Sequence, residues 1–135
     1  MLTQYGTIAW RRDEDGAVRI LLITSRDTRR WVVPRGNAIA GLSPAESGAQ
    51  EAFEEAGVRG TVSEEPVGSY RYQKRRRNGA AIPAEVLLFS LQVAQELADW
   101  PERRQRERRW FAPAEAAGAV EEPELKALLR DFAGG

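Results

Sequence analysis

The stretch GNAIAGLSPAESGAQEAFEEAGV, residues 36–58, decides how this chain folds, and it reads as a loop that runs into one helix. Ser43 is a good N-cap, a proline follows at the first helical position, and Glu46 stands where its side chain can close a capping box. Gly57 supplies the left-handed residue that commonly ends a helix. Because the start and stop signals agree, the sequence predicts a helix over residues 44–56.

Two faces are expected on this helix when its residues are placed about 100° apart. One arc is apolar and consists of Ala45, Ala49, Ala52, Phe53 and Ala56. The opposite arc is acidic and consists of Glu51, Glu54 and Glu55, with Ser47 beside them. Like charges at this spacing weaken a helix unless a cation lies among them. The acidic arc is therefore either a solvated face, the usual fate of glutamates, or a site for a hard divalent cation such as Mg²⁺.

The spacing of the whole stretch resembles the Nudix box, G-x5-E-x7-R-E-U-x-E-E-x-G-U, in which U is a bulky apolar residue. The matching positions are Gly36, Glu51, Glu54, Glu55, Gly57 and Val58. Three positions depart from the box: Leu42 replaces its first Glu, Gln50 replaces its Arg and Ala52 replaces its first U.

Similarity to this family extends beyond the box, over roughly residues 4–130. Residues 20–36 (ILLITSRDTRRWVVPRG) and the run from Trp100-Pro101-Glu102 to Phe111 look like segments of the diphosphoinositol and diadenosine polyphosphate phosphohydrolase branch. The resemblance implies an α+β fold, a Nudix-type α/β/α sandwich with a mixed central sheet. It also implies one domain over residues 1–135, in which the box forms a loop, a helix and a second loop.

The same resemblance implies a metal-dependent pyrophosphohydrolase. Its substrate would be a nucleoside or dinucleoside polyphosphate or a diphosphoinositol-type compound, and its cofactor Mg²⁺, with Mn²⁺ as an alternative. The family's metal ligands fall on Glu51, Glu54 and Glu55, one of which also serves as base for the attacking water, and the backbone carbonyl of Gly36 is implied as a further ligand. Phosphoanhydride cleavage needs neutralised phosphate oxygens and a positioned water, both of which a metal site supplies.

Composition narrows the chemistry further. The chain has 135 residues and a net charge of zero, and it lacks both cysteine and histidine, so a base must be Glu, Asp, Tyr, Lys or a metal-bound water. No apolar run approaches the roughly 18 residues needed to cross a bilayer, and the first residues do not resemble a signal peptide. We therefore expect a cytoplasmic protein that does not enter a membrane. The sequence leaves the oligomeric state open.

Arginine dominates the basic residues: of 20 Lys plus Arg, only Lys74 and Lys126 are lysine. Either codon bias or phosphate recognition by guanidinium groups accounts for this. Two basic clusters, residues 71–77 and 103–109, favour a polyanionic small-molecule substrate with more than two phosphates. The candidate phosphate-binding residues are Arg26, Arg35, Arg71, Lys74 and Arg106. Each of them, taken singly, also fits a solvated surface role.

Two other function classes stay open. The losses at Leu42 and Gln50 suggest a degenerate Nudix-like binding module without catalysis, although the intact glutamate triad argues against it. Lys74-Arg75-Arg76-Arg77 suggests a nucleic-acid-binding domain, which zero net charge and the acidic helix make a weaker hypothesis. Because Glu and Arg are lost together, we expect a compensated swap in which Leu42 packs apolar surface where that pair would lie.

The rest of the chain predicts strands around the helix. The expected strands cover residues 4–10, 18–24, 31–34, 68–74 and 82–94, with a short segment at 110–111. Turns are expected at Asp15-Gly16 and Asn78-Gly79, and residues 60–68 are expected to be a link. Helices are expected over residues 113–118 and 123–132.

Overall fold

The computed structural model describes residues 1–135, and the helix that the box predicts is present. In chain order the elements are β1 (Leu2–Arg12), β2 (Val18–Thr24), β3 (Trp31–Val32), β4 (Arg35–Gly36), α1 (Pro44–Ala56), β5 (Val58–Val62), β6 (Gly68–Arg75), β7 (Ala81–Glu96), β8 (Arg108–Phe111), α2 (Pro113–Ala119) and α3 (Pro123–Arg130). Both bonds of the capping box form, because Glu46 N donates to Ser43 Oγ at 3.1 Å and Ser43 N donates to Glu46 Oε1 at 2.8 Å. Gly57 ends α1 with a φ of 68°.

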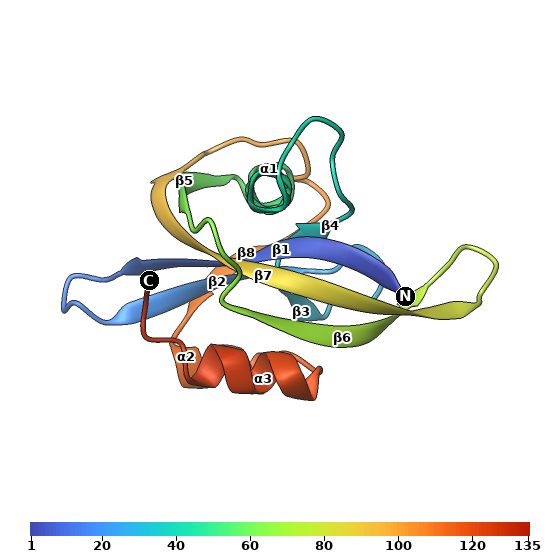
Figure 1. Ribbon diagram of the computed structural model, residues 1–135. Helices are drawn as coiled ribbons and strands as arrows, with labels where there is room; N and C mark the ends of the chain where they lie inside the picture. Colours follow the sequence, from blue (N-terminus) through green and yellow to red (C-terminus); the bar gives the residue numbers. More distant parts are fainter.

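One mixed sheet forms the middle of the molecule. β1 and β7 pair in parallel, and the other strand pairs are antiparallel. The long strand β7 pairs with β6 through its first half and with β5 through its second. α1 covers one face of the sheet, and α2 and α3 cover the other (Figure 1). The expected α/β/α sandwich is therefore confirmed.

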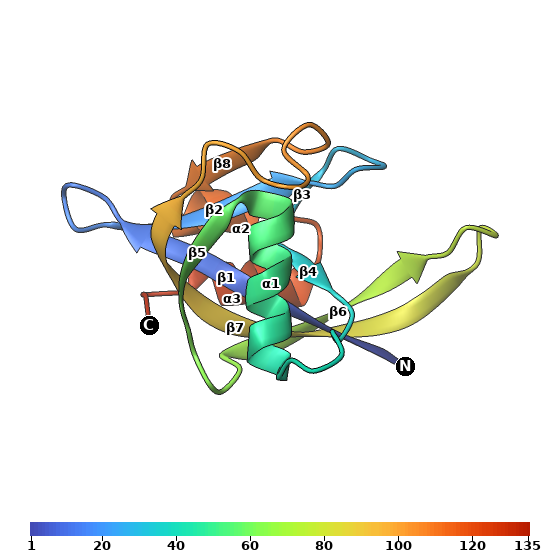
Figure 2. The same ribbon diagram turned by 90° about the horizontal axis from the view of Figure 1, so that it is seen from above.

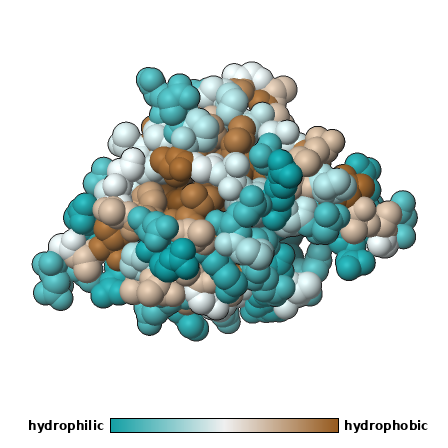
Figure 3. Space-filling view, turned by 60° about the horizontal axis from the view of Figure 1, so that its bottom comes forward, coloured by the Kyte–Doolittle hydropathy of each residue, from teal (hydrophilic) through white to brown (hydrophobic).

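The core has two layers, one on each side of the sheet. The larger cluster lies under α2 and α3 and includes the fully buried Leu125 and Leu129 of α3. The smaller cluster lies under α1 and includes Ala52 and Ala56. Seen from the side of α2 and α3, the surface is mostly hydrophilic (Figure 3), because these helices turn their apolar residues toward the sheet. None of the three helices is both long and apolar enough to span a membrane.

Both hairpins that the turn signals predict are present. Gly16 and Gly79 take φ angles of 81° and 85° at the tips of the β1–β2 and β6–β7 hairpins. Only glycine and a few polar residues adopt this region at low cost. The β6–β7 hairpin, which carries the first basic cluster, projects well beyond the body of the molecule (Figure 2).

The expectation that residues 60–68 form a link is wrong at its start, because β5 (Val58–Val62) pairs with β7. A Cβ at Gly60 would lie 1.9 Å from Gln92 O, so this glycine lets the strand approach β7 at a register shift. A glycine inside a short polar run is typical of a loop. Pairing with a long neighbouring strand, which is a tertiary effect, makes it a strand here.

The expected division of α1 into an apolar and an acidic arc is also partly wrong. Glu55 is 7% exposed and Ser47 is fully buried, although both were expected on the outer face. Phe53, expected in the core, is half-buried and lies under the guanidinium of Arg59, 4.2 Å from its ring centre. The buried face is rotated because Gly48 sits directly on the backbone of Gly6, where a Cβ would come 3.1 Å from Gly6 O.

Candidate active site

A cleft of about 600 Å³ opens beside the C-terminal half of α1. Its walls come from β1, the loop after β2, β4, α1, β6 and the loop before β8, so residues far apart in the sequence meet there. Polar and charged side chains line most of it, with Val32 and Val33 among the few apolar ones. Its acidic side consists of Glu51, Glu55 and Glu102 with Arg106 bonded among them, and the other lining cations, which include Arg26, Arg35, Lys74 and Arg75, come from other elements. Such a cavity suits a highly charged ligand.

The acidic side contains three carboxylates. Glu51 and Glu55 lie one turn apart on α1, and Glu102 comes from the loop that precedes β8. Burial raises the pKa of Glu55 to about 9, and the adjacent Glu51 adds to the effect. Burial also raises the pKa of Glu51. Crowded carboxylates of this kind hold a proton or a cation between them.

Gly36 lies directly against this acidic group. A Cβ at Gly36 would fall 2.4 Å from Cδ of Glu51, so any other residue here would require the carboxylate of Glu51 to move. Arg35, the residue before Gly36, donates its backbone N–H to Glu55 Oε1 at 3.3 Å. The short strand β4 thus places backbone atoms and two glutamates of α1 side by side.

The remaining predicted ligand is placed differently. Glu54 is half-buried and does not line the cleft, although its charge contributes to the raised pKa of Glu51. Across residues 1–135, no three His, Cys, Asp or Glu side chains converge into a metal-binding cluster. The donor chemistry nevertheless fits a hard divalent cation, because Glu51 and Glu55 offer carboxylate oxygens next to the backbone of Gly36.

Arg106, a predicted phosphate ligand, lies in the cleft but is tied to protein atoms. Its side chain is 10% exposed; Nε donates to Glu102 Oε1 at 2.8 Å and Nη1 donates to Thr24 O at 3.2 Å. Its Nη2 lies 3.9 Å from Glu55 Oε2. Arg106 therefore braces two carboxylates, which leaves few of its donors for a substrate.

Arg35 is the most enclosed cation on the opposite side. Its Nη1 donates to the hydroxyl of Tyr70 at 2.9 Å, and its guanidinium lies 4.0 Å from the ring centre of Tyr72. No carboxylate oxygen lies within 4.0 Å of its guanidinium nitrogens. A partly desolvated cation without a carboxylate partner suits an anionic ligand.

Three further predicted phosphate ligands differ in position. Arg26 and Lys74 line the cleft, and Arg26 also donates to Gln105 Oε1 at 3.2 Å. Arg71 is exposed on β6 and does not line the cleft; its backbone N–H donates to Glu124 Oε1 at 2.8 Å. The structure thus brings together all the predicted phosphate ligands except Arg71.

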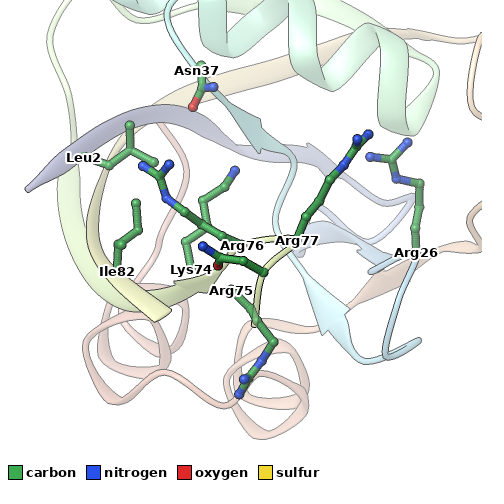
Figure 4. A pocket seen from close by; sticks show the side chains of 9 residues that line it. Leu2, Arg26, Asn37, Lys74, Arg75, Arg76, Arg77 and Ile82 are labelled. Atoms are coloured by element: carbon green, nitrogen blue, oxygen red, sulfur yellow. The ribbon is translucent and has the colours of Figure 1, made fainter. Parts of the chain in front are cut away.

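A second, strongly basic hollow of about 710 Å³ adjoins the cleft and shares Arg26, Asn37, Lys74 and Arg75 with it. Arg76 and Arg77 of the projecting hairpin also line it, and the side chains of Arg77 and Arg26 reach toward each other (Figure 4). None of the five cationic residues at positions 71–77 of the hairpin forms an ion pair. The cationic side of the cleft therefore continues along the hairpin.

The second basic cluster, residues 103–109, was expected to face the cleft, but most of its arginines point elsewhere. Of its five arginines only Arg106 lines it. Arg108 donates to Ala56 O at 2.9 Å and to Leu97 O at 2.8 Å, and Arg109 lies over Trp31, 4.9 Å from its ring centre. This cluster serves mainly to attach the loop to the rest of the protein.

Glu102 is the cleft residue that sequence reasoning missed. Its loop docks on the end of α1, where Glu102 N donates to Glu54 O at 3.0 Å and Trp100 Nε1 donates to Glu55 O at 3.2 Å. The signal available in the sequence is the Trp100-Pro101-Glu102 run, which by itself indicates only a family resemblance.

The departures from the box do not form the expected swap. Leu42 is 38% exposed, so the expectation that it packs apolar surface in place of the missing pair is wrong. Gln50 is half-buried, and its side chain forms no hydrogen bond within the protein. The loop between Gly36 and α1 turns position 42 toward solvent, where neither a charge nor an apolar group has much effect.

Comparison with known proteins agrees with this geometry. A family model described as the NUDIX domain matches residues 2–132. The chain is 32% identical over 121 residues to "Nudix hydrolase 12, mitochondrial" of Arabidopsis thaliana, covering 85% of this chain and 58% of that protein. It is 28% identical over 111 residues to "Diphosphoinositol polyphosphate phosphohydrolase 3-beta" of Bos taurus, covering 81% of this chain and 63% of that protein. The chain thus spans about three fifths of the length of such relatives.

Among solved structures, a C. elegans Ap4A hydrolase in a binary complex superimposes with a TM-score of 0.72. The two chains are 20% identical, and the match covers 96% of this chain and 93% of the other. At that identity the likeness concerns the fold alone.

Proposed function

The chain belongs to the Nudix domain family, and from that premise we propose that it is a metal-dependent pyrophosphohydrolase. It cleaves a phosphoanhydride bond in a small polyanionic substrate. The observation that carries the proposal is that one cleft holds both carboxylates and cations without a carboxylate partner. Glu51, Glu55 and Glu102 line it, and so do Arg35 and Lys74, neither of which forms an ion pair. A phosphoanhydride substrate needs both, a cation site at the reacting phosphate and positive groups for the remaining oxygens.

The resident cation in this proposal is Mg²⁺ or Mn²⁺, held by Glu51 and Glu55 in the cleft and by the backbone carbonyl of Gly36. The box implies Glu54 as a further ligand, although its side chain does not line the cleft in this structure. When bound, it supplies charge neutralisation at the phosphate oxygens and a more acidic water. Support comes from the crowded carboxylates and from the close approach of Gly36 to the carboxylate of Glu51. Carboxylate oxygens are the donors that hard cations prefer.

The chain's own residues complete the reaction. One carboxylate of Glu51, Glu54 or Glu55 accepts the proton of the attacking water. Arg106 keeps the carboxylates of Glu55 and Glu102 in place through its bonds to them. Arg35 and Lys74 bind phosphate oxygens across the cleft, with Arg26 at its mouth.

The substrate class we propose is one with more than two phosphates: a nucleoside or dinucleoside polyphosphate, or a diphosphoinositol. The basic hollow supports this, because it extends the cationic surface past the space that a single diphosphate fills. Two similar proteins carry matching descriptions, one as a diphosphoinositol polyphosphate phosphohydrolase and one as an Ap4A hydrolase.

The test is phosphate release from a panel of diphosphate and polyphosphate compounds, with Mg²⁺, with Mn²⁺ and with excess chelator. We expect turnover only with a divalent cation, and faster turnover for the longer compounds. Full activity in chelator contradicts the metal role, and a clear preference for ADP-ribose or a simple nucleoside triphosphate contradicts the substrate class.

A non-catalytic binding module is the second candidate. Two observations favour it: Leu42 and Gln50 replace the charged pair of the box, and the carboxylates do not converge into a preformed metal cluster. The same panel separates the two. Tight binding of a polyphosphate without turnover, under every cation tested, places the binding module first.

A further inference from the structure

Arg35 is enclosed by two tyrosines of β6. Tyr70, which is fully buried, accepts a hydrogen bond from Nη1 at 2.9 Å, and the ring of Tyr72 lies under the guanidinium at 4.0 Å. One edge and one face of the guanidinium are therefore occupied by neutral groups. Its other N–H donors have no partner within the protein and remain for the cleft, where Arg35 is a lining residue.

No carboxylate pairs with the guanidinium of Arg35. The buried acid Glu122, which is 7% exposed, accepts from Nη1 of Arg30 at 3.1 Å. Arg30 also approaches Glu121, with 3.9 Å between Nε and Oε2, so both of these acids pair with Arg30 and neither pairs with Arg35. A cation kept from water without a full counter-charge is costly, and an anionic ligand offsets that cost.

Tyr70 is a neutral partner for Arg35. Its hydroxyl accepts from Arg35, and it forms no hydrogen bond to Glu122, whose Oε1 is buried without a partner. Burial raises the pKa of Tyr70, and the nearby charge of Glu122 adds to this, so the hydroxyl keeps its proton. The contact with Tyr70 therefore orients Arg35 without neutralising its charge.

Tyr72 also organises the loop on the other side of Gly36. Its hydroxyl donates to Gln4 Oε1 at 2.5 Å, and Gln4 Nε2 donates to Asn37 Oδ1 at 3.0 Å. Gln4 is 2% exposed, so this chain of bonds is fixed by burial. The residues before and after Gly36 are therefore both held through the same tyrosine.

We propose that Tyr70 and Tyr72 are positioning residues that hold the guanidinium of Arg35 for bidentate capture of one phosphate. The stacking on Tyr72 and the hydrogen bond to Tyr70 orient the guanidinium before the ligand arrives. Its free edge can then donate two hydrogen bonds to two oxygens of one phosphate. Lysine at position 35 keeps the charge but loses both the stacked face and the fork. The inference rests on the proposed function in one respect only, that the cleft receives a phosphate.

The experiment measures binding of imidodiphosphate, a non-hydrolysable diphosphate, by calorimetry in excess chelator, so that neither metal nor turnover contributes. Arg35→Lys and Tyr70→Phe are each expected to weaken binding about tenfold, as for loss of a charge-assisted hydrogen bond. The double variant is expected to bind no more weakly than Arg35→Lys alone, because Tyr70 acts through Arg35. Tyr5→Phe is the matched control, since the hydroxyl of this third tyrosine forms no hydrogen bond and lies outside the cleft.

Melting temperatures recorded on the same samples separate positioning from folding. If Tyr70→Phe does not fold, Tyr72→Leu replaces it and is expected to weaken imidodiphosphate binding several-fold, because it removes the ring on which the guanidinium lies. Unchanged binding in the folded variants, or effects of Tyr70→Phe and Arg35→Lys that simply add, would overturn the proposal. If no compound of the hydrolysis panel is cleaved but the effects of Arg35→Lys and Tyr70→Phe on binding are coupled, the proposed activity is contradicted. The role assigned to Arg35 is then still supported.

Discussion

The two arginine clusters of this chain look alike in sequence and have opposite surroundings in the structure. In the cluster at residues 74–77, none of the cations pairs with an acid, and the side chains line a hollow next to the cleft. In the cluster at residues 103–109, Arg106 pairs with Glu102, Arg108 binds carbonyl oxygens at the end of α1, and Arg103 pairs with Asp99.

The difference shows that a run of arginine does not by itself identify a phosphate site. What decides the role is whether acceptors of the same chain already use the guanidinium. The second cluster fixes the loop that carries Glu102, and the first leaves its charge for a ligand. The following variants test this contrast, from the largest expected effect to the smallest.

Replacing Glu55, the carboxylate next to Arg106 of the second cluster, should have the largest effect on activity. Glu55→Gln removes an oxygen ligand and a candidate base, so we expect kcat to fall by a factor on the order of 10² or more. Glu54→Gln is expected to do the same if it supplies a ligand, as the box implies. Steady-state kinetics with Mg²⁺ measure both, and near-normal turnover in both variants contradicts the metal assignment.

The two clusters can be compared directly by measuring the stability of one variant from each, Arg106→Ala and Arg77→Ala. Arg106→Ala leaves Glu102 and Glu55 without their buried partner, at a cost of about 3 kcal/mol. We expect a fall in melting temperature on the order of 10 °C. Arg77→Ala, on the exposed hairpin, should change the free energy of unfolding by no more than about 0.5 kcal/mol. Equal effects of the two substitutions would contradict the assigned roles.

Neutralising the hairpin should act on substrate binding instead. With Arg75, Arg76 and Arg77 all replaced by Gln, KM for a substrate with more than two phosphates is expected to rise about tenfold, with a flatter dependence on salt. KM for a simple diphosphate should change little. The matched control replaces the exposed Arg103 and Arg104 by Gln, and an equal rise in KM there would show that only net charge matters.

A separate test, outside that order, uses the pH dependence of stability. Burial raises the pKa of Glu55 to about 9 in the folded protein from an ordinary value of 4.5, so the folded state binds the proton more tightly. The stabilisation that Glu55 contributes to the chelator-treated protein should therefore be complete below about pH 4.5 and should decline as the pH rises toward 9. Glu55→Gln should flatten this decline, as measured by chemical denaturation at several pH values. A decline of the same slope in the variant would assign it to other groups.

The sequence by itself determined α1 to the residue, because Ser43, Glu46 and Gly57 act within one or two turns of the chain. It also determined both hairpins, since left-handed glycines at their tips are local requirements. The family box supplied Glu51 and Gly36, and the structure places these two in contact.

Only the tertiary structure decided what surrounds those residues. Glu55 is buried because the loop before β8 docks on the end of α1. β5 is a strand because β7 is long enough to pair with it, and Leu42 is exposed because its loop turns outward. The roles of Glu102 and of Arg35 likewise depend on partners 47 to 51 and 35 to 37 residues away in the chain, such as Glu55 and Tyr70. Spacing along a sequence encodes local geometry, whereas burial and charge compensation depend on which distant segments pack together.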